Sequence, residues 1–158
     1  MDDRVIGKPE RPPERSIELT VPGEPMGKQR PRWSRYGSDP RQPHTPTKTK
    51  NYEVYIKELF VQKYPGFEPM NKPLKLLLAA YFTIPKSKSK KIKDLMSADV
   101  LRPTKAPDLD NCLKIVMDAL QGLAFINDAQ VTSIRAIKRW SHVPRIEIEI
   151  RDYDNIDR

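Results

Sequence analysis

The sequence predicts an α+β fold, with a mixed β-sheet of about four to five strands and helices packed on one face. Apolar residues alternate with period 2, typical of half-buried strands, near both ends of the chain, and helical apolar spacing occurs in its middle. A nearly continuous apolar run between two helical segments suits a central strand. Because 158 residues is about the size of one domain, we expect a single domain over residues 16–158.

The chain is predicted to begin with an arm, a strand and a loop. Residues 1–15 combine charges with prolines and cannot bury enough apolar surface to offset the entropy of ordering, so we expect a disordered or loosely ordered arm. Residues 16–22 (SIELTVP) alternate Ile17, Leu19 and Val21 with polar neighbours and predict the first strand. Residues 23–49 hold glycine, proline and many cations without any period, which predicts a long basic loop.

Helix and strand patterns then alternate. Residues 50–64 place Tyr52, Leu59 and Phe60 at helical spacing, and Pro65-Gly66 ends this helix. Residues 74–84 (LKLLLAAYFTI) predict the central strand, which Pro85 ends. Residues 87–97 can form a short basic helix with Ser87 or Ser89 as its N-cap.

The C-terminal part contains the clearest helix, over residues 108–121 (DLDNCLKIVMDALQ), followed by Gly122 where glycine is favoured. Residues 130–140 and 143–151 alternate as two strands, and Ser141-His142 between them suits a hairpin turn. Ile115 and Ala119 lie off the main apolar stripe of the helix and indicate a second burial surface. A two-fold homodimer is the economical hypothesis for that surface.

Composition narrows the class of partner. The formal charge of +8 and a pI near 9.6 favour attraction to a polyanion, so nucleic acid is the leading partner class. The single cysteine, Cys112, excludes an intramolecular disulfide and a cysteine zinc cluster, which fits a reducing compartment. No apolar run reaches the length of a membrane span and no signal-peptide core is visible, so we expect a cytoplasmic protein without membrane contact.

Candidate catalytic residues gather in and after the 108–121 helix. Asp108 and Asp110 stand at its start, where either could simply cap the helix. Asp110, Lys114 and Asp118 follow at i,i+4 steps and form one polar ridge. The ordinary interpretation of that ridge is a pair of surface salt bridges, each contributing about 0.3–0.5 kcal/mol.

A third acid, Asp128, is not explained by that interpretation. The connection from residue 121 to residue 128 is long enough to double back along the helix, so Asp128 can reach Asp108 and Asp110. A carboxylate cluster is a suitable ligand set for Mg²⁺, which keeps several waters and lets a substrate phosphate complete its octahedron. Lys114 would offset the negative charge that develops on the phosphorus during hydrolysis.

These residues carry a family resemblance. PDLDNCLKIVMDAL followed by GLAFINDAQV closely resembles the RusA family of Holliday-junction resolvases, whose pattern is D-x-D-N, Lys, Asp and a further Asp before a strand. VPGEPMGKQRPR and TPTKTKNYE also look like members of this family, so the resemblance covers residues 16–151.

The resemblance implies a function for each matched residue. Asp108, Asp110 and Asp128 would be metal-binding catalytic acids, Lys114 the essential lysine, and Asn111 and Asp118 supporting residues. It further implies Mg²⁺ dependence, with Mn²⁺ as a possible substitute, a homodimer, and symmetric nicking of four-way DNA junctions in recombination and repair by a bacterial or phage protein. Some members carry a basic residue directly before the first Asp, where this chain has Pro107; Lys105 is the candidate to replace it.

Basic segments supply candidate DNA contacts. Lys28, Arg30, Arg32 and Arg35 stand in the 23–49 loop with Trp33 and Tyr36, which suits phosphate contacts together with stacking on exposed bases. The loop could instead be merely solvated, and the run from Lys86 to Lys93 could be only a charged face.

Two other functions stay open at this stage. A basic, structure-selective DNA-binding protein without catalysis would use the acids only as caps and ion pairs. A nuclease for flaps or duplex DNA would share the same site and differ only in the geometry of its substrate. Asp110→Asn separates the binding protein from the nucleases, because only a nuclease has cleavage to lose.

Overall fold

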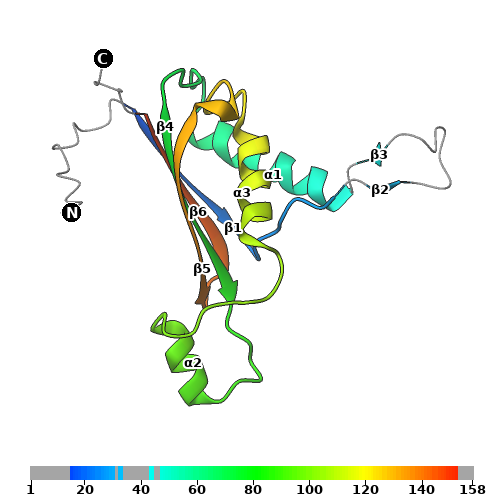
Figure 1. Ribbon diagram of the computed structural model, residues 1–158, viewed down its shortest axis with the longest axis vertical. Coiled ribbons are helices and arrows are strands. Elements are labelled where there is room, and N and C mark those ends of the chain that lie inside the picture. Colours follow the sequence, from blue (N-terminus) through cyan, green and yellow to red (C-terminus); the bar gives the residue numbers. More distant parts are fainter. Residues whose placement is uncertain (1–14, 31, 34–42, 45–46, 153–158) are drawn as a thin grey trace, which may run out of the picture.

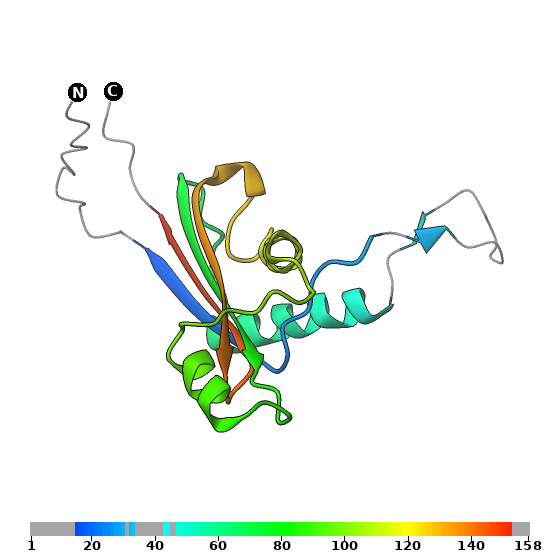
Figure 2. The same cartoon turned by 60° about the horizontal axis from the view of Figure 1, so that its bottom comes forward.

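A computed structural model describes residues 15–30, 32–33, 43–44 and 47–152. A four-stranded mixed sheet forms one layer, and helices α1 and α3 pack on one of its faces (Figures 1 and 2). The predicted α+β class and the placing of helices on one face are therefore confirmed. Apart from Arg15, the predicted N-terminal arm lies outside the described residues.

The sheet follows the alternation of the sequence. Its strands are β1 (Ser16–Pro22), β4 (Leu74–Thr83), β5 (Val131–Ser141) and β6 (Arg145–Asp152), in the order β1-β6-β4-β5. Every second side chain of β1, β4 and β6 is buried against the helices. The core of the sheet comprises Ile17, Leu19, Val21, Leu74, Leu76, Leu78, Ala80, Phe82, Ile146, Ile148 and Ile150.

The predicted hairpin between the last two strands is wrong. β5 pairs with β4 in parallel, and β6 pairs antiparallel with β4 and β1, so β4 lies between the two strands that are consecutive in sequence. The apolar character of β4 on its buried face suits a strand with neighbours on both sides. Residues 142–144 therefore carry the chain past the end of β4 rather than through a two-residue hairpin turn.

Helices α1 (Thr47–Lys63) and α3 (Leu109–Leu120) lie against each other and against the sheet, as Figure 2 shows with α3 viewed end-on. Ile115 and Ala119 of α3 are fully buried within this one chain. The second apolar surface of α3 is thus explained by helix–helix packing with α1, and it gives no support to a dimer. Gly122, with φ of 84°, follows the end of α3 as predicted.

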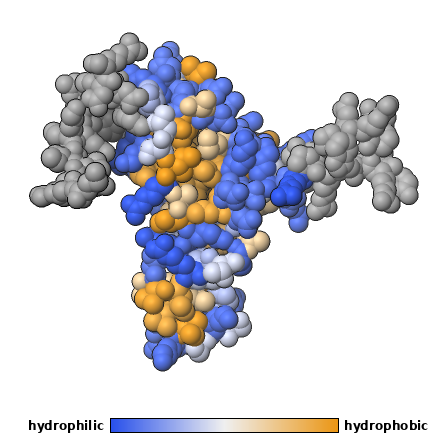
Figure 3. Space-filling model, viewed as in Figure 1, coloured by the Kyte–Doolittle hydropathy of each residue, from blue (hydrophilic) through white to orange (hydrophobic). Residues whose placement is uncertain are grey.

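The remaining elements lie outside the layer of helices α1 and α3 and the sheet that they cover. Helix α2 (Lys90–Ser97) is capped by Ser89, whose hydroxyl accepts from the backbone N–H of Ile92 at 3.4 Å. It projects beyond the end of the sheet, and an apolar area on that part of the surface borders hydrophilic side chains (Figures 1 and 3). Strands β2 (Arg32–Trp33) and β3 (Pro43–His44) pair antiparallel inside the segment predicted as a loop, and α1 begins three residues earlier than predicted.

A short 3-10 helix, η1 (Asp128–Gln130), precedes β5. In the described part of the chain, none of the helices is long and apolar enough to cross a membrane.

Candidate active site

Asp108 and Asp110 stand at the start of α3 as two exposed carboxylates. Asp108 is the N-cap by its backbone, since its carbonyl accepts from the N–H of Cys112 at 3.1 Å, but its side chain makes no capping hydrogen bond. Across the described residues, neither carboxylate has a hydrogen bond or an ion pair. The alternative in which Asp108 serves as a side-chain cap is therefore not realised, and both carboxylates keep their oxygens free for a ligand.

Lys114 lies between two other acids. Its Nζ is 3.3 Å from Oδ1 of Asp118, one turn along α3, and 3.9 Å from Oδ2 of Asp128. The Lys114 side chain is 55% exposed, so its ammonium can reach a ligand in solvent. The predicted Lys114–Asp118 pair is confirmed, whereas Asp110 forms no pair with Lys114 within the described chain.

The segment that follows α3 sets the position of Asp128. Ala124 and Phe125 are fully buried, and the N–H of Met70 donates to the carbonyl of Ala124 at 2.9 Å. Asn127 caps η1 in a reciprocal capping box with Gln130, whose amide also donates to the carbonyl of Met70 at 2.9 Å. Together with the N–H of Asp128, which donates to Oε1 of Gln121 at 3.3 Å, these contacts fix Asp128 within reach of the Lys114 ammonium.

The donor chemistry near α3 suits a hard divalent cation. All the candidate ligands are carboxylate oxygens, and Mg²⁺ takes one or two protein carboxylates beside water and phosphate. Among the described residues, no three side chains of His, Cys, Asp or Glu lie close enough together to hold one ion. The predicted meeting of Asp128 with Asp108 and Asp110 stays a prediction.

A distant segment is clamped against the start of α3. The N–H of Lys28 donates to the carbonyl of Asn111 at 2.9 Å. A Cβ on Gly27 would lie 2.8 Å from Cβ of Pro107 and 2.9 Å from Cβ of Asn111. Only glycine permits such a close approach without a shift, so residues 27 and 28 help to set where the Asp108–Asp110 segment lies.

Lys28 was predicted to contact DNA, but the structure gives it two partners within its own chain. Its Nζ makes a short contact with Oδ2 of Asp118 and lies 3.3 Å from Oε1 of Glu53. Burial lowers the pKa of Lys28, but Asp118, by its hydrogen bond and charge, and Glu53 outweigh burial and raise the pKa above its ordinary value. The Lys28 ammonium is therefore charged and paired with Asp118 and Glu53.

The other predicted DNA contacts divide into two groups. Arg30 is exposed, and the Nζ of Lys105 lies 5.5 Å from the ring centroids of both Phe82 and Trp140, with the residue still exposed. The side chains of the remaining candidates lie outside the described residues: Arg32, Trp33 and Arg35.

Sequence reasoning missed Lys138 on β5. This residue stands on the helix-facing side of the sheet, opposite Ala80, and its Nζ donates to the carbonyls of Lys105 and Pro107, the latter at 2.9 Å. Lys138 therefore helps to hold the residues directly before Asp108 in position. The only signal in the sequence is a lysine in the inward register of an alternating strand, a position where apolar residues are usual.

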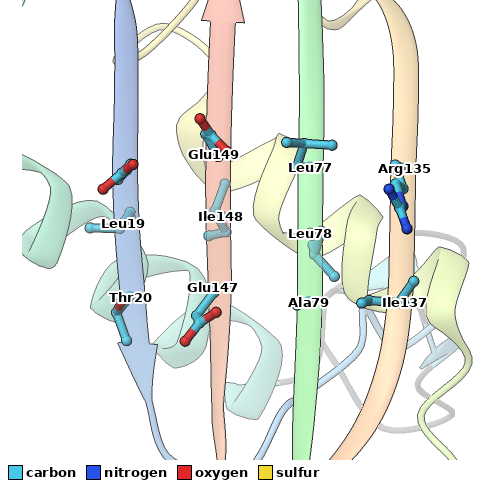
Figure 4. Close-up of a pocket in the computed structure, with 11 residues that line it drawn as sticks. Leu19, Thr20, Leu77, Leu78, Ala79, Arg135, Ile137, Glu147, Ile148 and Glu149 are labelled. Atoms are coloured by element: carbon cyan, nitrogen blue, oxygen red, sulfur yellow. The ribbon is translucent and has the colours of Figure 1, made fainter. Parts of the chain in front are cut away.

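A separate hollow lies on the sheet face that the helices leave bare (Figure 4). It measures about 490 Å³, and its side chains come from all four strands of the main sheet. Two of its glutamates are paired inside the sheet, Glu147 with Arg145 at 2.7 Å and Glu149 with Arg151. These charges satisfy one another, and we assign no reaction to this hollow.

The chain is similar to known proteins over most of its length. The family described as "Endodeoxyribonuclease RusA" matches residues 22–151. An uncharacterized protein, YqaN of Bacillus subtilis (strain 168), is 36% identical over 138 residues, which cover 86% of this chain and 96% of that protein. The matched range includes α3, η1 and the clamp formed by residues 27 and 28.

Proposed function

Because the chain belongs to the RusA endodeoxyribonuclease family, we propose that it is a Mg²⁺-dependent endonuclease that resolves four-way DNA junctions by paired symmetric nicks. The observation that supports this function best is the pair Asp108 and Asp110, exposed at a helix start without any partner in the described chain. A purely structural pair of acids would be expected to cap the helix or to form ion pairs.

The acids would hold the metal, and their chemistry fits it. Asp108 and Asp110 supply carboxylate oxygens from one helix start, and Asp128 would complete the set directly or through water. A bound Mg²⁺ supplies a water of lowered pKa and polarises the phosphorus–oxygen bond that breaks.

The remaining residues bind and orient the DNA backbone. The positive end of the α3 dipole lies at Asp108–Asp110 and favours an anionic phosphate beside the acids once their charge is neutralised. Lys114, held between Asp118 and Asp128, offers a half-exposed ammonium to a phosphate oxygen whose charge grows as the bond breaks. Arg30 and Lys105 provide exposed cations for the flanking phosphates.

We propose a homodimer on the symmetry of the substrate. A four-way junction presents two equivalent strands for cleavage, and a two-fold dimer presents two equivalent sites. Sedimentation at micromolar concentration measures the oligomeric state directly. A protein that stays monomeric with junction DNA bound would contradict the proposed homodimer.

The test is cleavage of a labelled four-way junction beside a matched duplex and a flap, with Mg²⁺, Mn²⁺ or EDTA. We expect paired nicks in the junction that need the divalent ion and are lost in Asp110→Asn, while junction binding is retained or tighter. Asp94→Asn, the same change at an exposed acid of α2, is the matched control and should cleave normally. Tight binding without nicks supports a binding-only protein, and equal cleavage of flap or duplex assigns a different substrate.

A further inference from the structure

Five charged side chains form one continuous chain of contacts beside α3. It runs from Glu53 on α1 through Lys28, Asp118 and Lys114 to Asp128, with successive nitrogen–oxygen distances of 3.9 Å or less. These contacts join four segments: the linker after β1, helices α1 and α3, and the start of η1. Its last two members are residues of the proposed active site.

Asp118 is the middle member of this series of contacts. Its Oδ2 takes the ammonium of Lys28, and its Oδ1 lies 3.3 Å from the ammonium of Lys114. With Oδ2 occupied, Asp118 can offer only one oxygen to Lys114, so Lys114 is held in place without being fully neutralised. Its Nζ stays within 3.9 Å of Asp128 and keeps charge for a further anion.

From this geometry we propose that Lys28 and Asp118 are positioning residues that fix the ammonium of Lys114 for the cleavage step. The inference deepens the proposed function and rests on it. It also reassigns Lys28, because its residue type and basic surroundings otherwise suggest a phosphate contact.

Burial and the backbone both oppose a phosphate contact by Lys28. Its side chain is only 29% exposed, and its backbone N–H donates to the carbonyl of Asn111 at 2.9 Å. Turning its ammonium to DNA would leave the carboxylates of Glu53 and Asp118, which are 19% and 21% exposed, without their shared cation. Asp118 would keep only Lys114, and Glu53 would lose its ion pair, which is unfavourable for carboxylates that are mostly buried.

A double-mutant cycle separates positioning from DNA contact. Lys28→Met and Asp118→Asn are each expected to lower the single-turnover cleavage rate at saturating junction by about tenfold, with the dissociation constant for the junction unchanged. The double variant should be no slower than the slower single variant, because both changes break the same anchor. Lys28→Arg, which keeps the charge and its two partners, should restore most of the rate.

Lys57→Met is the matched control, since it removes an equal charge from an exposed position on α1 and should leave the rate unchanged. Thermal unfolding of each variant shows that it is folded. The proposal is overturned if Lys28→Met instead weakens junction binding, lowers the slope of log K against log salt by about 0.9, and adds to the effect of Asp118→Asn.

A readout without cleavage keeps this inference distinct from the proposed function. Relaxation of the Lys114 ammonium, measured by side-chain ¹⁵N NMR in the absence of DNA, should show greater mobility in Lys28→Met and Asp118→Asn than in the unaltered protein. Unchanged mobility overturns the positioning role. A protein that cleaves no DNA yet shows this change in mobility retains the positioning and loses the nuclease assignment.

Discussion

Substitution of Gly27 by alanine tests whether the clamp on α3 determines the position of the acid pair. The added Cβ would lie 2.8 Å from Pro107 Cβ and 2.9 Å from Asn111 Cβ, about 0.6–0.7 Å inside the ~3.5 Å at which carbon–carbon contact becomes favourable. One of these atoms belongs to a proline ring and the other is fixed to a helix backbone, so no side-chain rotation relieves the overlap. Either the start of α3 or the segment around residue 27 must therefore shift by a comparable distance.

Two energies set the magnitude. Overpacking of this kind costs about 1–3 kcal/mol, and the lower chain entropy of the unfolded alanine variant offsets about 0.4–1 kcal/mol. A net loss of about 1–2 kcal/mol lowers the melting temperature of a chain of this size by about 2–8 °C. A displacement approaching 1 Å at a reacting group can cost up to about 100-fold in rate, so we expect about a tenfold fall in junction cleavage.

Calorimetry and single-turnover cleavage measure the two effects. Gly66→Ala is the control: its φ of 68° strains an alanine, but no atom lies within 4 Å of the added Cβ. It should lose a similar amount of stability and keep full cleavage activity. The reasoning is refuted if Gly27→Ala matches the unaltered protein in both measurements, or if Gly66→Ala loses cleavage equally.

Three further changes probe the surroundings of the site and the core. Lys138→Met removes a charged donor from the carbonyl of Pro107 and should cost about 1.5–3 kcal/mol in urea unfolding and also slow cleavage; unchanged unfolding would contradict the anchor. Leu76→Ala, at a fully buried position of β4, should cost about 2–5 kcal/mol by calorimetry, and a loss below 1 kcal/mol would show that the core collapses around the gap. Burial raises the pKa of Tyr52, which packs in the core. The tyrosine therefore ionises more readily in the unfolded chain, and the free energy of unfolding falls as the pH rises above about 10. In urea titrations, Tyr52→Phe should lose less stability between pH 7 and 10.5 than the unaltered protein. An equal loss in both proteins would show that Tyr52 does not cause the pH dependence.

The local pattern of apolar residues predicted the helices and strands, but it did not predict which strands pair with each other. Alternation in residues 131–141 and 145–152 reports which side chains face the core, and it carries no information about which strand lies alongside. A short connection favours a hairpin, yet β4 takes the place between them because it can pair on both edges. The same limit applies to Ile115 and Ala119, whose burial pattern was predicted correctly while the neighbour that buries them was not.

Residue chemistry gave the acids and the lysine of the candidate site as predictions, but it did not predict the contacts that hold them in position. The i,i+4 spacing of Lys114 and Asp118 on one helix specifies their contact, because helix geometry is regular. Lys28 and Lys138 reach α3 and its preceding loop from the linker after β1 and from β5, and their targets include main-chain carbonyls. Such contacts depend on tertiary structure. From its basic character alone, Lys28 was predicted to contact DNA, whereas in the fold its ammonium contacts Asp118.

The partners of the acids divide the site into two halves. Asp118 and Asp128 lie 3.3 and 3.9 Å from the Lys114 ammonium, whereas Asp108 and Asp110 have no ion pair in the described chain. Two unneutralised carboxylates two residues apart repel each other, and the helix dipole offsets only about 0.3–1 kcal/mol for each. Stability alone would favour a lysine or arginine beside them, and natural sequences keep such local conflicts chiefly where function needs them. The bare pair at the start of α3 therefore favours a cation-dependent reaction over a protein that only binds DNA.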